Sequence, residues 1–412
     1  MGLKISRVKS AQIRGRRCIW LLGFFLVANI YLIPWLTQSP RATDLIGVIL
    51  GLVLFVRLAI RGLRPIPLIT LLLLVTAPIA WTIYALDVRD WATISRSIRW
   101  FVALPWAYML FVMSREPESR CALVWGMWWG VIVNLGVVIM QFLGQDRLMQ
   151  AVGLAARDEQ LTTVYGLLRY PGMHGCVNAS AAVISLAVPL SLTLFYESSK
   201  SIGVVIIGLT VLAVSTGITL SRSPALVAAT TLTIVLLFSL RFRRSVKLFV
   251  LLVAACVVAI TVLGPPGGWQ RWTDIQNYQM NLSGRVYTNI TSLKLLAQHP
   301  LGIGVSSRGE LVGATHNAFL QASLEYGLLF GIFIFCLMLT MASRVLWGLR
   351  GLFGVEGVLA LHMTGLFFFE EHLNNPTFII LCTWVSISAV EWISLVLKRS
   401  KHYNTKGLSH VQ

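Results

Sequence analysis

The chain has 412 residues, of which 56% are hydrophobic and only 12% are charged, whereas about a quarter of the residues in a soluble domain are charged. A soluble core of this length could not bury so much apolar surface, so we predict an all-α integral membrane protein. The net charge is +18. The basic residues cluster at the ends of apolar runs, as topology signals do, and this placement argues against nucleic-acid binding.

Apolar runs of the length that crosses a bilayer recur along the whole chain, since a membrane-spanning helix needs about 20 mostly apolar residues. The first run is too long for the core of a signal peptide and no A-x-A cleavage site follows it, so we interpret it as a span. We expect one polytopic membrane domain over residues 1–412, with about 12 transmembrane helices. The predicted spans are 18–37, 44–60, 66–86, 92–113, 121–143, 176–196, 202–219, 223–240, 246–263, 317–340, 352–369 and 376–397.

The distribution of lysine and arginine predicts the orientation. With a cytoplasmic N-terminus, 22 of the 34 basic residues fall in or beside cytoplasmic segments and 12 on the other side. The positive-inside rule therefore favours cytoplasmic N- and C-termini. Two long segments, 144–175 and 264–315, then face the periplasm.

The segment 264–315 is the longest predicted loop. It opens with Gly264-Pro265-Pro266-Gly267-Gly268, which stops a helix. One helical stretch is expected from about Gly284 to Gln298, followed by a turn-forming run from His299 to Gly304. We find no Walker motif and no GxGxxG, which argues against an ATP-driven machine. The six cysteines form no CxxC pair, and we expect them to be buried thiols inside helices.

Charges inside or beside spans are costly, so they are candidate functional positions. On the outer side these are Arg169, Arg222, Arg285 and His316. Arg222, in the Ser221-Arg222-Ser223-Pro224 turn, is either a snorkelling interfacial arginine or a guanidinium fork for a phosphate. Arg285 opens the predicted loop helix and is either a solvated loop charge or a phosphate ligand. Arg169 is either a headgroup anchor or a substrate-binding residue.

His316 heads a polar stripe on span ten. Asn317, Gln321 and Glu325 follow at i, i+4 and i+8 and share one helix face. Such a stripe should face the bundle interior or a water-filled cavity, and a neutral imidazole at its outer end is able to accept a hydroxyl proton. We expect Glu325 to be a buried carboxyl bonded to another helix. Asn317 and Gln321 are candidate substrate ligands.

Arg96 and Arg99 lie on one face of span four, near its outer end. They either add to a phosphate site or anchor the helix beside Trp91 and Trp100. We expect no metal site and no cofactor.

Several of these motifs together resemble the conserved region of the O-antigen ligase and polymerase superfamily. The resemblance covers most of residues 160–340. The matching pieces are Arg169-Tyr170-Pro171-Gly172, Ser221-Arg222, Gly284-Arg285, His299 to Gly304, His316 to Leu320, Glu325-Tyr326-Gly327 and Gly331.

The resemblance implies a GT-C type glycosyltransferase that acts on the periplasmic face. It implies transfer of a glycan from undecaprenyl pyrophosphate to an acceptor, with inversion and without a metal or nucleotide. Arg222 and Arg285 would hold the pyrophosphate and stabilise the leaving group, and His316 would activate or orient the acceptor hydroxyl. The loop 264–315 is short compared with the periplasmic domains of many relatives, which weakens the assignment of the acceptor.

Two alternatives compete with a ligase that uses a lipid A–core acceptor. One is an O-antigen or exopolysaccharide polymerase of the same superfamily, and the other is a multi-span solute transporter. Transporters tend to place polar groups near the membrane midplane on interrupted helices, whereas Arg222, Arg285 and His316 gather at one predicted surface. The sequence therefore favours glycan transfer.

Overall fold

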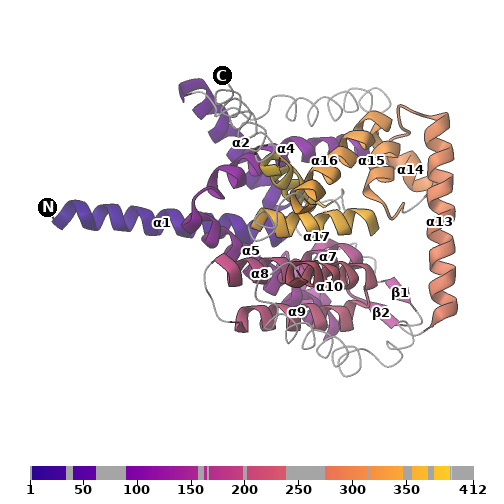
Figure 1. The fold of residues 1–412 in the computed structure, drawn as a ribbon, viewed down its shortest axis with the longest axis horizontal. Coiled ribbons are helices and arrows are strands. Elements are labelled where there is room, and N and C mark those ends of the chain that lie inside the picture. The colour runs from indigo at the N-terminus through magenta and orange to yellow at the C-terminus, as the bar shows by residue number, and fades with distance from the viewer. Residues whose placement is uncertain are drawn as a thin grey trace, which may run out of the picture.

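The protein is described from a computed structural model. It is built almost wholly from helices around one large apolar core and two smaller apolar clusters, with a single two-stranded hairpin among the residues described (Figure 1). The structure describes residues 2–33, 40–61, 90–155, 162–164, 167–197, 202–237, 274–312, 315–346, 355–369, 375–389 and 391. The predicted spans 66–86 and 246–263 lie outside these residues.

The N-terminal half of the bundle consists of α1 (Gly2–Val27), α2 (Ala42–Arg61), α4 (Trp91–Met113) and α5 (Pro117–Phe142). Helix α1 packs along α5, and α2 packs along α4. Gly23 and Gly126 let the first pair approach closely, since an added Cβ at either would meet backbone of the other helix.

The second half consists of helices that pack on α5 and on one another. Helices α7 (Val177–Ser185) and α8 (Ala187–Glu197) continue each other almost in line, and the turn at Leu220 separates α9 from α10. The remaining members are α9 (Gly203–Thr219), α10 (Arg222–Leu237), α17 (Val355–Phe369) and the helix Pro376–Ala389.

Most predicted spans correspond to helices, and two helices are long and apolar enough to cross a membrane: Pro117–Phe142 and Val177–Tyr196. The first predicted span, 18–37, does not match the limits of the helix that the structure shows. Helix α1 begins at Gly2 and ends at Val27, and the chain then pairs Tyr31 with Arg41 in an isolated bridge. The apolar run of the sequence continues to Leu36, so hydropathy alone cannot place this end.

The predicted span 317–340 was also wrong as one helix. It divides into α15 (Ala318–Tyr326) and α16 (Leu328–Leu346). Gly327 separates them with φ +95 and ψ 161, a conformation that an L-residue avoids. The N–H of Leu328 donates to the Pro300 carbonyl at 2.8 Å. The turn from His299 to Gly304 therefore stabilises the break between the two helices.

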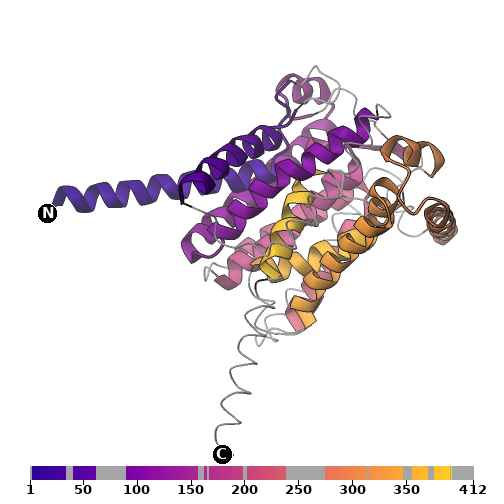
Figure 2. The ribbon, with the colours of Figure 1, turned by 90° about the horizontal axis from the view of Figure 1, so that it is seen from above.

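The two long segments predicted to face the periplasm lie at the same end of the bundle, opposite the free end of α1 (Figures 1 and 2). The first carries α6 (Asp146–Ala151), the antiparallel hairpin of β1 (Thr162–Val164) and β2 (Leu167–Arg169), and η1 (Gly172–His174). The second carries α13 (Ile275–Gln298) and α14 (Val305–Leu311).

Helix α13 lies across this end of the bundle, since it stands upright in Figure 1 and is seen end-on in Figure 2. It begins nine residues before the predicted start at Gly284, so Arg285 lies within the helix and does not open it. The apolar residues at 275, 278, 282 and 286 recur every three to four positions, and this helical period extends the element toward its N-terminus.

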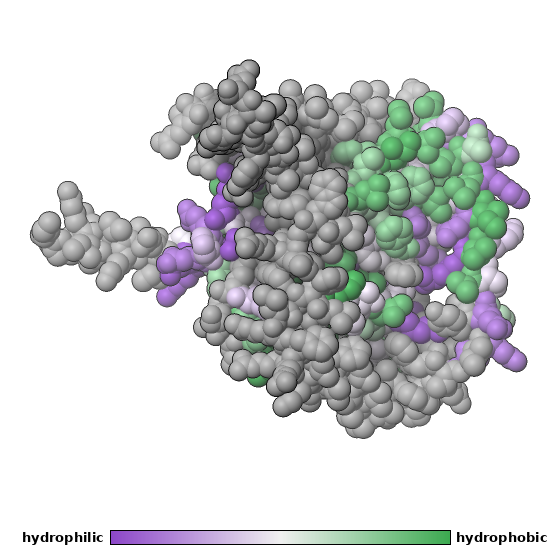
Figure 3. All heavy atoms as spheres, in the orientation of Figure 1, coloured by the Kyte–Doolittle hydropathy of each residue, from purple (hydrophilic) through white to green (hydrophobic). Residues whose placement is uncertain are grey.

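Apolar side chains gather on the surface over α13 and α16 (Figure 3). The exposed residues on α13 include Leu282, Val286, Ile290 and Leu293, and those on α16 include Leu329, Ile332, Phe335 and Leu339. An apolar surface of this extent is rare on soluble monomers and typical of one that meets lipid or a partner.

The described cysteines are all free thiols. The expectation of burial holds for Cys382 but was wrong for Cys18, Cys176 and Cys336, whose side chains are exposed. Cys18 and Cys336 lie on exposed faces of α1 and α16, and Cys176 lies at the exposed start of α7.

Candidate active site

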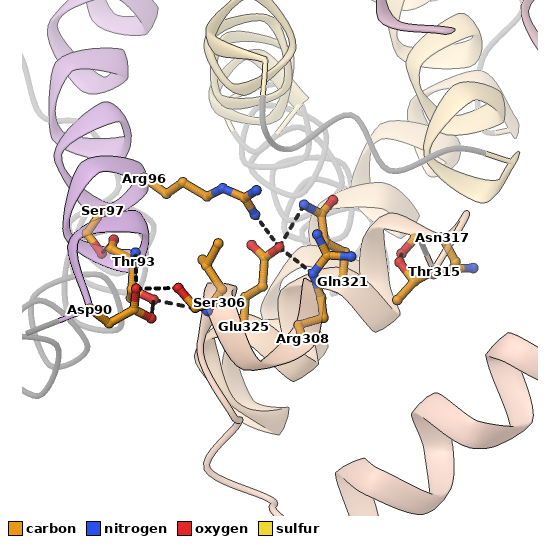
Figure 4. A network of polar contacts seen from close by, with 11 residues as sticks. Asp90, Thr93, Arg96, Ser97, Ser306, Arg308, Thr315, Asn317, Gln321 and Glu325 are labelled. Atoms are coloured by element: carbon orange, nitrogen blue, oxygen red, sulfur yellow. Dashed lines mark hydrogen bonds and ion pairs between the residues drawn. The ribbon is translucent and has the colours of Figure 1, made fainter. Parts of the chain in front are cut away.

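Glu325 is buried at the centre of an ionic cluster between α4, α14 and α15 (Figure 4). Its side chain accepts a hydrogen bond from Arg96 of α4, lies 2.8 Å from Nε of Arg308, and accepts from Gln321 at 3.1 Å. Glu325 and Gln321 are fully buried and Arg308 is 5% exposed. The expectation that Glu325 is a buried carboxyl bonded to another helix is confirmed.

The cluster ties three elements together, because Arg96 comes from α4, Arg308 from α14, and Gln321 and Glu325 from α15. Gln321 and Glu325 share a helix face, as their spacing predicts. Both side chains, and that of Arg96, are committed to this contact, so we assign them first to holding α15 in place.

A second polar contact joins α4 to α14. Asp90 accepts from the hydroxyls of Thr93 at 2.6 Å and Ser306 at 2.8 Å, and Thr93 accepts from the N–H of Val305 at 3.0 Å. Burial raises the pKa of Asp90, but the hydrogen bonds from Thr93 and Ser306 outweigh it and lower the pKa overall. The carboxylate is therefore ionised at neutral pH and fixes the start of α14.

His316 and Asn317 form the entrance to α15. Asn317 is the N-cap, and its Oδ1 accepts from the N–H of Leu320 at 3.1 Å. The Thr315 hydroxyl donates to the Asn317 carbonyl at 3.2 Å. His316 has φ 50, a left-handed conformation that is strained for a residue other than glycine. Strain of this kind concentrates at functional sites, and it distinguishes the partly buried His316 from an ordinary helical histidine.

Arg285 lies near the middle of α13, which packs against α15. Its side chain is partly buried. Arg285 and His316 therefore occupy neighbouring elements at one end of the bundle, although they are 31 positions apart in the sequence.

Arg222 is the first residue of α10, directly after a left-handed turn at Leu220. Arg169, at the end of β2, reaches this turn: its Nε donates to the Thr219 carbonyl at 2.8 Å. The hairpin lies at the same end of the bundle as α13 (Figure 1), so this contact brings the Arg222 turn to that end as well. Arg99 lies partly buried on α4, one turn from Arg96.

Arg308 is the residue that sequence reasoning missed. It lies in a stretch predicted as loop, Ser306-Ser307-Arg308-Gly309-Glu310, and only the fold brings it to Glu325. A signal was available, because a lone carboxylate buried in a membrane helix requires compensating cations.

No group of three or more His, Cys, Asp or Glu within the described parts of the chain is arranged to hold a metal ion. The end of the bundle that carries α13 offers guanidinium groups, imidazoles and a set of hydrogen-bonding side chains. Such a set suits binding of an anionic group and transfer of a proton.

A family model described as O-Antigen ligase matches residues 202–336. Over these residues the chain is similar to the O-antigen ligase family. The match confirms the resemblance inferred from the motifs, and it supports an O-antigen ligase- or polymerase-type membrane enzyme. No curated protein matches the chain.

The O-antigen ligase region contains Arg222, Arg285 and His316, and also the newly found pair of Arg308 and Glu325. Arg96, Arg99 and Arg169 lie outside it. The ionic cluster therefore joins the matched region to α4, in the part of the chain that precedes it.

Proposed function

We propose that the chain is an inverting, metal-independent glycosyltransferase. In this proposal it moves a glycan from undecaprenyl pyrophosphate to a sugar of lipid A–core, on the periplasmic face of the bacterial inner membrane. One observation carries the proposal: the Arg222 turn, α13 with Arg285, and the His316 entrance to α15 lie at one end of the bundle (Figure 1), all within the region matched by the O-antigen ligase family.

The chemistry assigns one role to each group. Arg222 and Arg285 bind the pyrophosphate through their planar guanidinium forks and neutralise the charge that develops as it leaves. His316 accepts the proton of the acceptor hydroxyl. The acceptor oxygen forms its bond to the anomeric carbon from the face opposite the breaking bond to the pyrophosphate oxygen, which inverts the configuration.

The other candidate residues support this centre. Asn317 caps α15 directly beside His316, and its exposed portion and Arg99 remain candidates for substrate contact. Arg96 and Gln321 act through Glu325 to hold α15. In this proposal 1–412 is one membrane domain, and the outer segment 264–315 supplies part of the active site.

The first test is alanine substitution of Arg222, Arg285 and His316, one at a time, in membrane vesicles supplied with lipid-linked glycan and acceptor. Each variant is expected to lose at least about 100-fold of the transfer rate while still inserting, since charge stabilisation and general-base catalysis each contribute that much. Arginine to lysine is also expected to be damaging, because lysine lacks the planar fork. Chelators are expected to have no effect.

Two exposed cations at the same end serve as matched controls. Lys294→Ala removes a charge from α13, and Arg147→Ala removes one from α6. Both variants are expected to keep near-normal transfer. If two of the three site variants retain normal activity at normal abundance, the proposed site is wrong.

A polymerase of the same superfamily is the second candidate, because the matched region is common to both reactions. A polymerase would use the same pyrophosphate site, with a second polyprenyl-linked glycan as the acceptor. A multi-span transporter is disfavoured, because the candidate residues gather at one end of the bundle and transporter sites lie near the midplane.

A further inference from the structure

The guanidinium of Arg169 is buried between the β1–β2 hairpin and the α9–α10 turn. It is 7% exposed. Its Nε donates to the Thr219 carbonyl at 2.8 Å, and its Nη2 donates to Oδ1 of Asn178 at 3.0 Å. Thr219 is the last residue of α9, where carbonyls lack helical partners, and a charged donor is the strongest partner for such a group.

The turn that Arg169 contacts is strained. Leu220 has φ 53 and ψ 27 and is fully buried, and a left-handed residue other than glycine costs roughly 1–2 kcal/mol. The Ser221 hydroxyl donates to the same Oδ1 of Asn178 at 3.1 Å. Arg169 and Ser221 thus share one acceptor, and the next residue is Arg222.

Arg169 is itself held from both sides. On one side, the backbone of Arg169 pairs with Thr162 in the β1–β2 hairpin. The segment that follows is anchored in the core, where Gln141 accepts from the N–H of Gly172 at 2.7 Å and Asn134 accepts from the N–H of Met173 at 3.0 Å. The guanidinium therefore projects from a fixed base toward the turn.

We propose that Arg169 is a positioning residue that sets the direction of Arg222 by holding the Thr219–Ser221 turn in its left-handed conformation. The inference rests on the proposed role of Arg222 in binding pyrophosphate. It replaces the expectation that Arg169 binds substrate directly. A planar fork is required, because the two acceptors belong to different helices, α9 and α7, and one guanidinium reaches both.

The test is a double-mutant cycle between Arg169→Gln and Arg222→Lys, assayed by transfer in vesicles with long incubations. Arg169→Gln alone is expected to lower kcat/KM by about 30-fold or more at normal abundance. In the Arg222→Lys background the same change is expected to cost less than about 3-fold, because residues that act as a unit are non-additive. Arg169→Lys, which keeps the positive charge but lacks the fork that reaches both acceptors, is expected to be intermediate.

The matched control is Arg120, whose Nη1 donates to the Ser114 carbonyl at 3.0 Å in the loop before α5. Arg120→Gln removes a comparable bond from arginine to a backbone carbonyl, and its effect, whatever its size, is expected to be additive with Arg222→Lys. If Arg169→Gln fails to accumulate, Asn178→Ala replaces it in the cycle, since this change removes the shared acceptor and leaves the bond to Thr219.

The outcomes separate the two proposals. Additive losses for Arg169→Gln and Arg222→Lys, or full activity of Arg169→Gln, overturn the positioning role and leave the role of Arg222 intact. Full activity of both Arg222→Lys and Arg222→Ala removes Arg222 from the proposed site and overturns the positioning role with it. The proposed site as a whole is wrong only if Arg285→Ala or His316→Ala is fully active as well.

Discussion

At the residue scale, Glu325 pairs with the partly buried guanidinium of Arg96 and the buried guanidinium of Arg308. Truncating one partner of a buried ion pair leaves charge uncompensated, which costs about 3–5 kcal/mol. Glu325→Ala is therefore expected to lower the thermal unfolding midpoint of the purified protein markedly. It is also expected to reduce transfer, because α15 carries His316 at its entrance.

The control is Glu118, which pairs with Arg16 on the surface, where the two side chains are 68% and 47% exposed. Solvent-exposed pairs contribute little, so Glu118→Ala is expected to leave the midpoint almost unchanged. Equal midpoints for the Glu325 and Glu118 variants would contradict the assigned role of the cluster.

The sequence could predict part of this site. The spacing of Gln321 and Glu325 predicts one helix face, and their hydrogen bond confirms it. Burial of Glu325 followed from the cost of a charge in an apolar run. Arg308 could not be placed, because its position depends on how the turn from His299 to Gly304 folds back onto α15, and that is a tertiary contact.

At the element scale, the break between α15 and α16 depends on Gly327. With φ +95 and ψ 161, an alanine there is strained, and its Cβ would lie 2.9 Å from the Leu301 carbonyl oxygen. Gly327→Ala is expected to cost about 1–3 kcal/mol and to lower both the thermal midpoint and transfer. The midpoint of the purified variant is the measurement.

Gly136 within α5 provides the comparison, since an added Cβ there meets nothing within 4 Å. Gly136→Ala is expected to be neutral or to stabilise by up to about 1 kcal/mol, as alanine favours a helix interior. A Gly327→Ala variant as stable as the Gly136→Ala variant would show that the break does not require glycine.

Helix ends were the features that the sequence predicted least well. Hydropathy averages over a window, so the apolar runs on both sides of Gly327 merged into one predicted span. The start of α13 was predicted too late, at Gly284, although Gly284 is tolerated inside the helix with nothing near its absent Cβ. Long apolar runs with clear ends, such as α5 and the pair α7–α8, were predicted closely.

At the scale of the whole molecule, the segments 144–175 and 264–315 share one end of the bundle, and the free end of α1 lies at the other (Figure 2). The charge bias predicts that the shared end is periplasmic. In a variant without native cysteines, Gln276→Cys on α13 is expected to react with an impermeant maleimide in intact cells. Ser10→Cys on α1 is expected to react only after permeabilisation, and the reverse pattern would reject this topology.

The choice between ligase and polymerase also belongs to the whole molecule, because it depends on how many polyprenyl-linked substrates the outer end must hold. A polymerase needs two such sites. In the segment 144–175, Arg147, Arg157 and Arg169 are balanced by Asp146, Asp158 and Glu159. The guanidinium of Arg169 is also engaged by Thr219 and Asn178, which leaves this segment poorly suited to a second pyrophosphate.

We therefore expect one pyrophosphate site and an acceptor of another kind, such as lipid A–core approaching from the bilayer. Deletion of the gene separates the two reactions. Loss of a ligase leaves long polymers on undecaprenyl pyrophosphate together with bare lipid A–core, whereas loss of a polymerase leaves lipid A–core capped with a single repeat unit. We predict the first pattern, measured by electrophoresis of lipopolysaccharide and by extraction of lipid-linked glycans. Single-unit caps would reassign the chain as a polymerase that uses the same arginines and histidine.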